Sequence, residues 1–218
     1  MQIVYPSVEF VNFVSYEDLL HKITYGARKC YKSYKQENDT LEKNENFVRN
    51  IIKRGHESVL EHGAITLDIK TDRGVLAEFT RHRTGIAYSV ESTRYCNYSD
   101  SGIEFITPLT MYPKGCSEDI VNKHFESYEK AEKDYCELIR LGSTPQEARQ
   151  VLPMSLSTNM VVTANVREWR HILKLRTSTA AHPNCQHLFT VIQKLFLKHY
   201  PVFFDDIPQN EVYWNILP

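Results

Sequence analysis

Residues 80–98 read T-R-H-R-T-G-I-A-Y-S-V-E-S-T-R-Y-C-N-Y, a stretch that concentrates cations, hydroxyl groups and aromatic rings without the spacing of a buried core. Arg81, Arg83 and Arg94 offer planar guanidinium donors that suit phosphate or carboxylate groups. A solvated helix end followed by a polar loop is the alternative that an isolated R-H-R tripeptide favours. Tyrosines interleaved with the arginines favour instead a ligand with both phosphate and a flat heterocycle, such as a nucleotide or a flavin. These tyrosines are Tyr88, Tyr95 and Tyr98.

The composition of the chain predicts one globular domain over residues 1–218. The 218 residues are 42% hydrophobic and 24% charged, which is enough apolar material for a core. The formal charge of −1 gives no overall basic field, so we expect no nucleic-acid partner. No leader pattern opens the chain and no apolar run approaches a membrane span, so we expect neither export nor a membrane. Five scattered cysteines without C-x-x-C spacing predict reduced thiols and a cytoplasmic location.

The periodicity of apolar residues predicts an α+β fold with a mixed or antiparallel sheet flanked by helices. Strands are expected at residues 2–14 with a break at Pro6, and at 64–70 and 156–164. Helices are expected at residues 16–32, 41–54, 74–83, 118–141, 147–152, 165–176 and 183–199. Residues 33–40 and 99–114 are expected to be loops, and residues 200–218 to pack aromatic rings at a subunit contact.

The helix expected at residues 74–83 leads directly into the arginine-rich stretch. Its apolar positions Val75, Leu76 and Phe79 are expected to face the core. Its polar residues Glu78, Arg81 and His82 then lie toward the C-terminal end, where they can converge with the following loop. This helix therefore connects the core to the expected site.

Residues 55–62, G-H-E-S-V-L-E-H, contain two histidines and two carboxylates, a set that invites a metal-site interpretation. His56 and His62 are six positions apart, which places them about 240° apart on a helix. A helical zinc site needs histidines four positions apart on one face. We therefore expect no metal here, and the alternative is a structural histidine with satisfied hydrogen bonds.

Residues 165–176, N-V-R-E-W-R-H-I-L-K-L-R, form the second polar block. Asn165 suits the N-cap of a helix. On that helix Arg167, His171 and Leu175 lie near one face, with Arg176 one position further. One stripe of side chains can therefore serve one ligand.

The quoted blocks resemble the flavin-dependent thymidylate synthases, which methylate deoxyuridylate (dUMP) with a reduced flavin instead of a protein nucleophile. R-H-R with S-T-R-Y is similar to the signature of that family, as are G-H-x-S-x-x-E-H, the A-R-Q-V-L-P of residues 148–153, and N-x-R with the closing L-R of residues 165–176. The resemblance covers residues 55–176 with its blocks in the family order. Three departures are one extra residue between Arg83 and Ser92, His171 in place of an asparagine, and Glu78 where many members have glutamine.

The resemblance implies ligand roles for individual residues. The implied FAD contacts are His56, Ser58, Arg81, His82, Arg83, Asn165, Arg167 and His171. The implied dUMP contacts are Glu78, Phe79, Thr80, Arg81, Ser92, Thr93, Arg94, Arg149 and Arg176. Arg176 is the implied catalytic residue, because a guanidinium can stabilise negative charge that develops on the uracil imide.

The resemblance also implies the reaction and its cofactors. FAD would carry the hydride, NADPH would reduce it, and 5,10-methylenetetrahydrofolate would donate the carbon, for dTTP biosynthesis in a homotetramer with shared sites. No cysteine stands in an activating context apart from Cys96 between Tyr95 and Asn97, which agrees with chemistry that needs no protein nucleophile. Two alternatives stay open: an FAD-dependent reductase without methyl transfer, and a nucleic-acid-binding module.

Overall fold

A four-stranded antiparallel sheet in the order β2-β3-β6-β4 is the centre of the computed structural model, which describes residues 1–33, 40–99 and 102–209. Its strands are β2 (Ser7–Phe10), β3 (Ala64–Asp72), β6 (Ser157–Asn165) and β4 (Ile86–Val90). A separate parallel pair joins β1 (Gln2–Val4) to β5 (Glu104–Ile106). The expected α+β domain with mixed and antiparallel pairing is therefore present.

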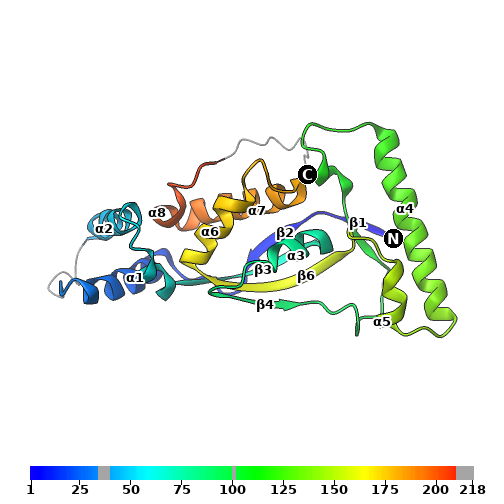
Figure 1. Ribbon diagram of the computed structural model, residues 1–218, viewed down its shortest axis with the longest axis horizontal. Coiled ribbons are helices and arrows are strands. Elements are labelled where there is room, and N and C mark those ends of the chain that lie inside the picture. The colour runs from blue at the N-terminus through cyan, green and yellow to red at the C-terminus, as the bar shows by residue number, and fades with distance from the viewer. Residues whose placement is uncertain (34–39, 100–101, 210–218) are drawn as a thin grey trace.

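The helices gather on one face and at the two ends of this sheet. Figure 1 shows α3, α6 and α7 over one face, α1 and α2 at one end, and α4 with α5 at the other. The α-helices are α1 (Tyr16–Cys30), α2 (Leu41–Lys53), α3 (Arg73–Phe79), α4 (Glu118–Arg140), α5 (Pro145–Ala148), α6 (Val166–Arg176), α7 (Pro183–His199) and α8 (Pro201–Phe204). Short 3-10 helices are η2 (Glu57–His62), η3 (Pro108–Met111) and η4 (Arg149–Val151).

The alternation of apolar and polar side chains along the central strands determines which face of the sheet the helices cover. Ile65, Leu67 and Ile69 of β3 are buried beneath the helices. Their neighbours point to the other face, where Thr66 Oγ1 lies 2.9 Å from Thr163 Oγ1 of β6. The main core therefore lies between one face of the sheet and the helices, as a half-covered antiparallel sheet requires.

Capping residues set several helix starts at the predicted positions. The Ser15 hydroxyl accepts a hydrogen bond from the Asp18 amide at the start of α1. Thr144 and Glu147 form a capping box at the start of α5. Pro183 opens α7, whose bounds agree with the prediction at both ends. Local side-chain chemistry is sufficient to fix these boundaries.

The structure corrects the predicted conformation of the arginine-rich stretch. The helix expected at residues 74–83 ends at Phe79, so Arg81 and His82 lie in the turn that follows it. The segment expected to be a polar loop contains β4, which pairs with β6 from Ile86 to Val90. Its alternating I-A-Y-S-V pattern is short and is flanked by charged and hydroxyl residues, so the strand signal is weak.

Other predicted connections also contain regular structure. Residues 99–114 include β5 and η3, and the helix expected at residues 147–152 is α5 followed by η4. Residues 34–39 of the expected loop and residues 210–218 of the expected aromatic terminus lie outside the described residues. Among the helices that the structure describes, none has the length and apolar character that crossing a membrane requires.

Candidate active site

The turn after α3 is held against the first residues of α6. The Asn165 amide donates to the Gly85 carbonyl oxygen at 3.0 Å, and the Asn165 side chain accepts from the Glu168 amide at 2.8 Å. Gly85 has φ +67°, and a Cβ there would lie 2.2 Å from Asn165 Nδ2. Only glycine adopts this φ without strain and leaves the Asn165 side chain in place. Gly85 therefore fixes the register between the two polar blocks.

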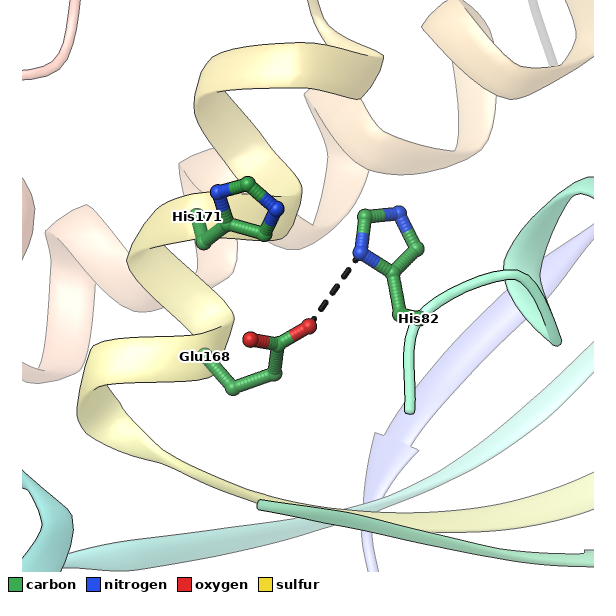
Figure 2. Close-up of side chains that lie close together, drawn as sticks. All are labelled: His82, Glu168 and His171. Carbon is green, nitrogen blue, oxygen red and sulfur yellow. Dashed lines mark hydrogen bonds and ion pairs between the residues drawn. The ribbon is translucent and has the colours of Figure 1, made fainter. Parts of the chain in front are cut away.

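His82 is a buried side chain that links α6 to the turn after α3. Its Nδ1 lies 3.2 Å from Glu168 Oε1, and its Nε2 accepts a hydrogen bond from Arg176 Nε at 3.1 Å. Figure 2 shows His82 beside Glu168 and His171, which both come from α6. Burial, and then the charge of Arg176, lower the pKa of His82 to about 4. His82 is therefore neutral at physiological pH.

Arg176 connects the end of α6 to Glu78 of α3. Its Nη1 donates to Glu78 Oε2 at 2.7 Å, and its Nη2 donates to the Glu78 carbonyl oxygen at 2.8 Å. The hydrogen bond from Arg176 holds the pKa of Glu78 below its usual value. Only 14% of the Arg176 side chain is exposed, so it is an inward-facing arginine and not an ordinary surface cation.

The 3-10 helix η2 places two carboxylates, Glu57 and Glu61, beside α6. Arg167 Nη1 lies 2.6 Å from Glu61 Oε1. Glu57 lies 3.9 Å from nitrogen atoms of three cations, which is too long for hydrogen bonds. These cations are Arg167, Arg170 and Lys174. The carboxylate of Glu57 therefore sits within a positive environment without a close contact to any of them.

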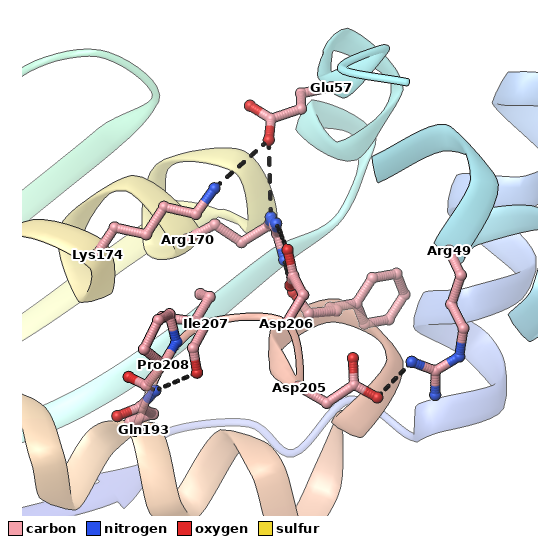
Figure 3. Close-up of polar contacts among 10 residues, drawn as sticks. Arg49, Glu57, Arg170, Lys174, Gln193, Asp205, Asp206, Ile207 and Pro208 are labelled. Carbon is pink, nitrogen blue, oxygen red and sulfur yellow. Dashed lines mark hydrogen bonds and ion pairs between the residues drawn. The ribbon is translucent and has the colours of Figure 1, made fainter. Parts of the chain in front are cut away.

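Arg170 is a structural cation behind this group. Its side chain is 1% exposed and binds both oxygens of Asp206 at 2.6 and 2.7 Å, while Nη1 also donates to the Phe203 carbonyl oxygen. Figure 3 shows this pair below Glu57 and beside Lys174. Its buried Nε has no hydrogen-bond partner among the described residues. Arg170 thus leaves one unsatisfied donor facing the Glu57 side.

Two adjoining cavities follow α6. One, of about 510 Å³, is lined by Arg81, His82, His171, Lys174, Leu175, Arg176, Ser178, Ala180 and Ala181. The other, of about 330 Å³, is lined by Glu57, Glu61, Thr84, Asn165, Arg167, Glu168, Arg170, His171 and Lys174. Both volumes are typical of ligand sites. His171 and Lys174 line both cavities, so the two are adjacent. Together they are called the polar trough, which presents cationic, amide and hydroxyl donors beside the carboxylates of Glu57, Glu61 and Glu168.

The trough brings together many of the residues with an expected flavin role. Arg81, His82, Asn165, Arg167 and His171 all line it. The remaining three, His56, Ser58 and Arg83, do not line it, although each is next in sequence to a residue that does. The ring of His56 is directed to the C-cap residue of α1, because its Nδ1 lies 2.5 Å from the Tyr31 hydroxyl.

The residues expected to contact dUMP fall into two groups. Arg81 and Arg176 line the trough, and Glu78 pairs with both of them from α3. The second group follows the opposite end of β4, where Arg149 Nη1 donates to Thr93 Oγ1 at 3.0 Å. β4 alone is roughly 13 Å long, at about 3.3 Å per residue. One chain therefore presents the two groups at separate places.

Three members of these two groups are held by local contacts. The Phe79 side chain is fully buried in the core, and its carbonyl oxygen accepts from the Tyr88 hydroxyl at 2.7 Å. The exposed Thr80 hydroxyl donates to the Ala77 carbonyl oxygen at 3.3 Å. In the second group, the Ser92 hydroxyl accepts from the Arg94 amide. A nucleotide contact by Phe79 would therefore have to use its backbone.

Glu57, Glu168 and Lys174 line the trough, although the sequence patterns did not single them out as site residues. Glu168 and His171 are three positions apart on α6, and this i, i+3 spacing indicates that they are neighbours. The spacing does not reveal His82, which lies 86 positions before Glu168. Nitrogen and oxygen atoms of His82, Glu168 and His171 come within 4.8 Å of one another, a grouping that was not expected from the sequence.

A third cavity, of about 570 Å³, lies on the other side of Glu78. It is lined largely by apolar side chains, including Ile106, Met111, Tyr128 and Met154. Glu78 belongs to its wall, while Arg176, the partner of Glu78, lines the polar trough. The Arg176–Glu78 pair therefore stands between an apolar and a polar cavity.

Comparison with known proteins matches nearly the whole chain to one family. The model of the family described as thymidylate synthase complementing protein matches residues 12–202. A probable flavin-dependent thymidylate synthase of Mycobacterium phage L5 is 32% identical over 192 residues, which cover 84% of this chain and 79% of that protein. The flavin-dependent thymidylate synthase of Corynebacterium aurimucosum is 29% identical over 195 residues, covering 84% and 78%. That of Mycobacterium bovis is 32% identical over 184 residues, covering 76% and 70%.

Proposed function

The chain belongs to the thymidylate synthase complementing protein family, and on this basis we propose that it acts as a flavin-dependent thymidylate synthase on dUMP. In this reaction NADPH is the reductant, 5,10-methylenetetrahydrofolate is the carbon donor and FAD is the flavin. The product, dTMP, supplies dTTP biosynthesis. We place the reaction in the cytoplasm, where the five free cysteines would stay reduced.

The single observation that carries this proposal is the convergence of the turn after α3 with α6 on the polar trough. Arg81 and Arg167 provide guanidinium donors, and Asn165 provides an amide at a helix start. Such donors suit the phosphates and polar chain of a dinucleotide flavin. The buried Arg170 Nε without a described partner adds a further donor in the wall. The residues present therefore fit an FAD site.

Arg176 is the residue that we assign to the uracil ring. When bound, the flavin supplies the hydride that completes the new methyl group. The protein's own contribution is to orient the nucleotide and to stabilise negative charge on its imide. Arg176 can do this with Nη1 and Nη2, the two donors that Glu78 holds in this structure.

The cysteines agree with a reaction that uses no protein nucleophile. Cys185 is buried, and burial raises the pKa of its thiol to about 12. Among the described residues that line the three cavities, none is a cysteine. A thiolate attack on the uracil ring therefore has no support at this site.

We propose that the working enzyme is a homotetramer whose sites combine residues from different subunits. The support is the separation of the two dUMP groups in one chain: Arg176 lies at the trough, while Ser92, Arg94 and Arg149 lie beyond the far end of β4. If one subunit supplies the first group and another the second, a single nucleotide can contact both. A flavin-loaded monomer in light scattering would contradict this arrangement.

The activity is tested with purified protein and stepwise omission of substrates. We expect bound flavin, and dTMP formation only when dUMP, 5,10-methylenetetrahydrofolate and NADPH are all present. NADPH oxidation without dTMP under all conditions would indicate the reductase alternative. Protein without flavin that binds single-stranded nucleic acid would indicate the binding-module alternative.

A further inference from the structure

Three side chains form a continuous chain of contacts from the core-facing side of α6 to the proposed uracil-binding arginine. Glu168 contacts His82 Nδ1 at 3.2 Å, and His82 Nε2 contacts Arg176 Nε at 3.1 Å. The exposed fractions of the first two side chains are 11% for Glu168 and 4% for His82. The His82–Glu168 contact is therefore shielded from water, which strengthens it and restrains both groups.

The direction of each hydrogen bond follows from the chemistry of arginine. A guanidinium only donates, so Nε2 of His82 must present its lone pair to Arg176. In a neutral imidazole the proton then resides on Nδ1, which donates it to the Glu168 carboxylate. Glu168 thus selects the one neutral tautomer of His82 that can accept from Arg176.

The same tautomer argues against a metal ion held by His82, Glu168 and His171, whose ligand atoms lie within 4.8 Å of one another. A metal needs a free lone pair on His82 Nδ1, and Nε2 would then carry the proton. That proton would face the N–H of Arg176 Nε. The positive charges of Arg176 and Arg81 beside the group also disfavour a cation there.

The two ends of the Arg176 guanidinium have different partners. Nη1 and Nη2 contact Glu78, whereas Nε contacts His82. The side chain of Glu78 is 36% exposed and lies where a nucleotide would compete for Nη1. A nucleotide can displace that carboxylate while the contact to His82 persists. The His82 contact can therefore keep the guanidinium aligned in the bound state.

We propose that Glu168 is a positioning residue for thymidylate synthesis: through the Nδ1–H of His82 it holds Arg176 in the orientation that receives the uracil ring. This inference rests on the proposed function, because it takes Arg176 as the residue that contacts dUMP. Glu168 lines the trough, and in this role it acts on the substrate through His82 and Arg176. Its contribution is pre-organisation of a group that acts in the reaction.

The test compares Glu168→Ala with Glu168→Gln in flavin-loaded enzyme. Gln keeps a carbonyl oxygen that can accept from Nδ1–H, and Ala does not. We expect Glu168→Ala to lower kcat for dTMP formation roughly tenfold, the equivalent of one hydrogen bond, with flavin reduction by NADPH nearly unchanged. Glu168→Gln should recover most of the loss. Glu45→Gln is the matched control, because Glu45 is a hydrogen-bonded glutamate on α2, whose carboxylate binds the Tyr16 hydroxyl.

A second measurement reports the tautomer directly. Nitrogen NMR of histidine-labelled enzyme, with the His82 signals assigned by their loss in His82→Gln, should show Nδ1 protonated in the wild type. Glu168→Ala should shift the ring toward the Nε2–H tautomer, and Glu168→Gln should not. A general folding defect would not produce this difference between the two variants. Both are measured in flavin-loaded protein, and only the loss of the hydrogen-bond acceptor at residue 168 is expected to change the tautomer of His82.

Three outcomes would overturn the inference. The first is an unchanged rate and an unchanged tautomer in Glu168→Ala. The second is a loss in Glu168→Ala that simply adds to that of Arg176→Lys in the double variant, since residues that act in series are not additive. The third is stoichiometric zinc in the wild type that is lost in Glu168→Ala and His171→Ala alike. If Arg176→Lys alone leaves dTMP formation unchanged, the uracil assignment fails, and the NMR result still decides the role of Glu168 at His82.

Discussion

Arg176 Nη1 and Glu78 Oε2 lie 2.7 Å apart, so in this structure the arginine assigned to the uracil ring is held by a carboxylate of α3. The two residues are 98 positions apart in the chain, and their pairing joins the end of α6 to the last turn of α3. Any anionic ligand that uses this guanidinium has to compete with Glu78. The strength of the Arg176–Glu78 ion pair therefore determines how readily Arg176 can bind such a ligand.

Glu78→Gln is expected to lower the KM for dUMP about fivefold. A charge-assisted hydrogen bond contributes about 1 kcal/mol more than a neutral one, so the Gln amide releases Arg176 more readily. The change also removes a negative charge beside an anionic substrate. Steady-state kinetics with dUMP as the varied substrate measure the effect, and the KM for NADPH is the internal control. An increased KM for dUMP would show that the Glu78 carboxylate is itself a nucleotide contact.

Gly85→Ala is expected to destabilise the fold and to lower flavin content. The left-handed φ of +67° imposes a strain of roughly 1–2 kcal/mol on alanine, and the new Cβ would displace Asn165. Gly142→Ala is the matched control, since Gly142 also has a positive φ, +97°, but a Cβ added there would have no contact within 4 Å among the described residues. Chemical denaturation gives the free energy of unfolding, and flavin absorbance gives the occupancy. Normal flavin content in Gly85→Ala would separate Asn165 from the flavin site.

Much of the fold can be predicted from local patterns, because caps and apolar periodicity act within a few residues. Asn165 is predicted to cap a helix and does so. β4 was missed because five residues of alternation beside arginines and hydroxyls give little signal, and the strand is held by its pairing with β6. The pairings of His82 with Glu168 and of Arg176 with Glu78 join distant segments, which no local pattern encodes.

Acid is expected to destabilise the protein partly through His82. Its pKa is lowered from 6.5 to about 4 by burial and by Arg176, so below pH 6.5 the unfolded chain binds a proton that the folded chain does not. The free energy of unfolding should therefore fall by roughly 2–3 kcal/mol between pH 6.5 and pH 4 on account of this group. Denaturation at a series of pH values should show a shallower slope in His82→Gln.

His187 is the necessary comparison for that experiment. Burial also lowers the pKa of His187 to about 4, so it contributes a similar slope over the same pH range. His82→Gln should therefore reduce the pH dependence without abolishing it, and His187→Gln should reduce it without affecting dTMP formation. An unchanged slope in His82→Gln would mean that His82 titrates normally in the folded protein.

Cys96→Ala is expected to retain most of its turnover. Cys96 is partly buried in the segment after β4, and the described linings of the cavities contain no cysteine. Because the proposed chemistry needs no protein thiol, the rate of dTMP formation in flavin-loaded protein should stay close to that of the wild type. Complete loss of activity in a folded, flavin-loaded variant would reinstate a covalent cysteine mechanism.

Arg176→Lys is the most direct test of the assignment of the uracil-binding group. Lysine keeps the charge but loses the planar fork, so it cannot contact His82 and a nucleotide with separate, fixed donors. The lost hydrogen bonding should amount to roughly 1.5–3 kcal/mol, or about a tenfold to hundredfold decrease in the rate of dTMP formation. A cation that only complements the C-terminal end of α6 would contribute about 0.3–1 kcal/mol to stability and little to the rate.

The two steps of turnover distinguish these roles of Arg176. Flavin reduction by NADPH and dTMP formation are measured separately in the same flavin-loaded preparation of Arg176→Lys. Because the uracil contact belongs only to the second step, we expect a nearly normal rate for the first and a large loss in the second. Lys174→Arg is a useful companion, since Lys174 lines the same trough but its Nζ faces the Glu57 carboxylate at 3.9 Å. Equal and near-wild-type rates for both steps in Arg176→Lys would place the nucleotide elsewhere, whereas equal losses in both would assign Arg176 to the flavin.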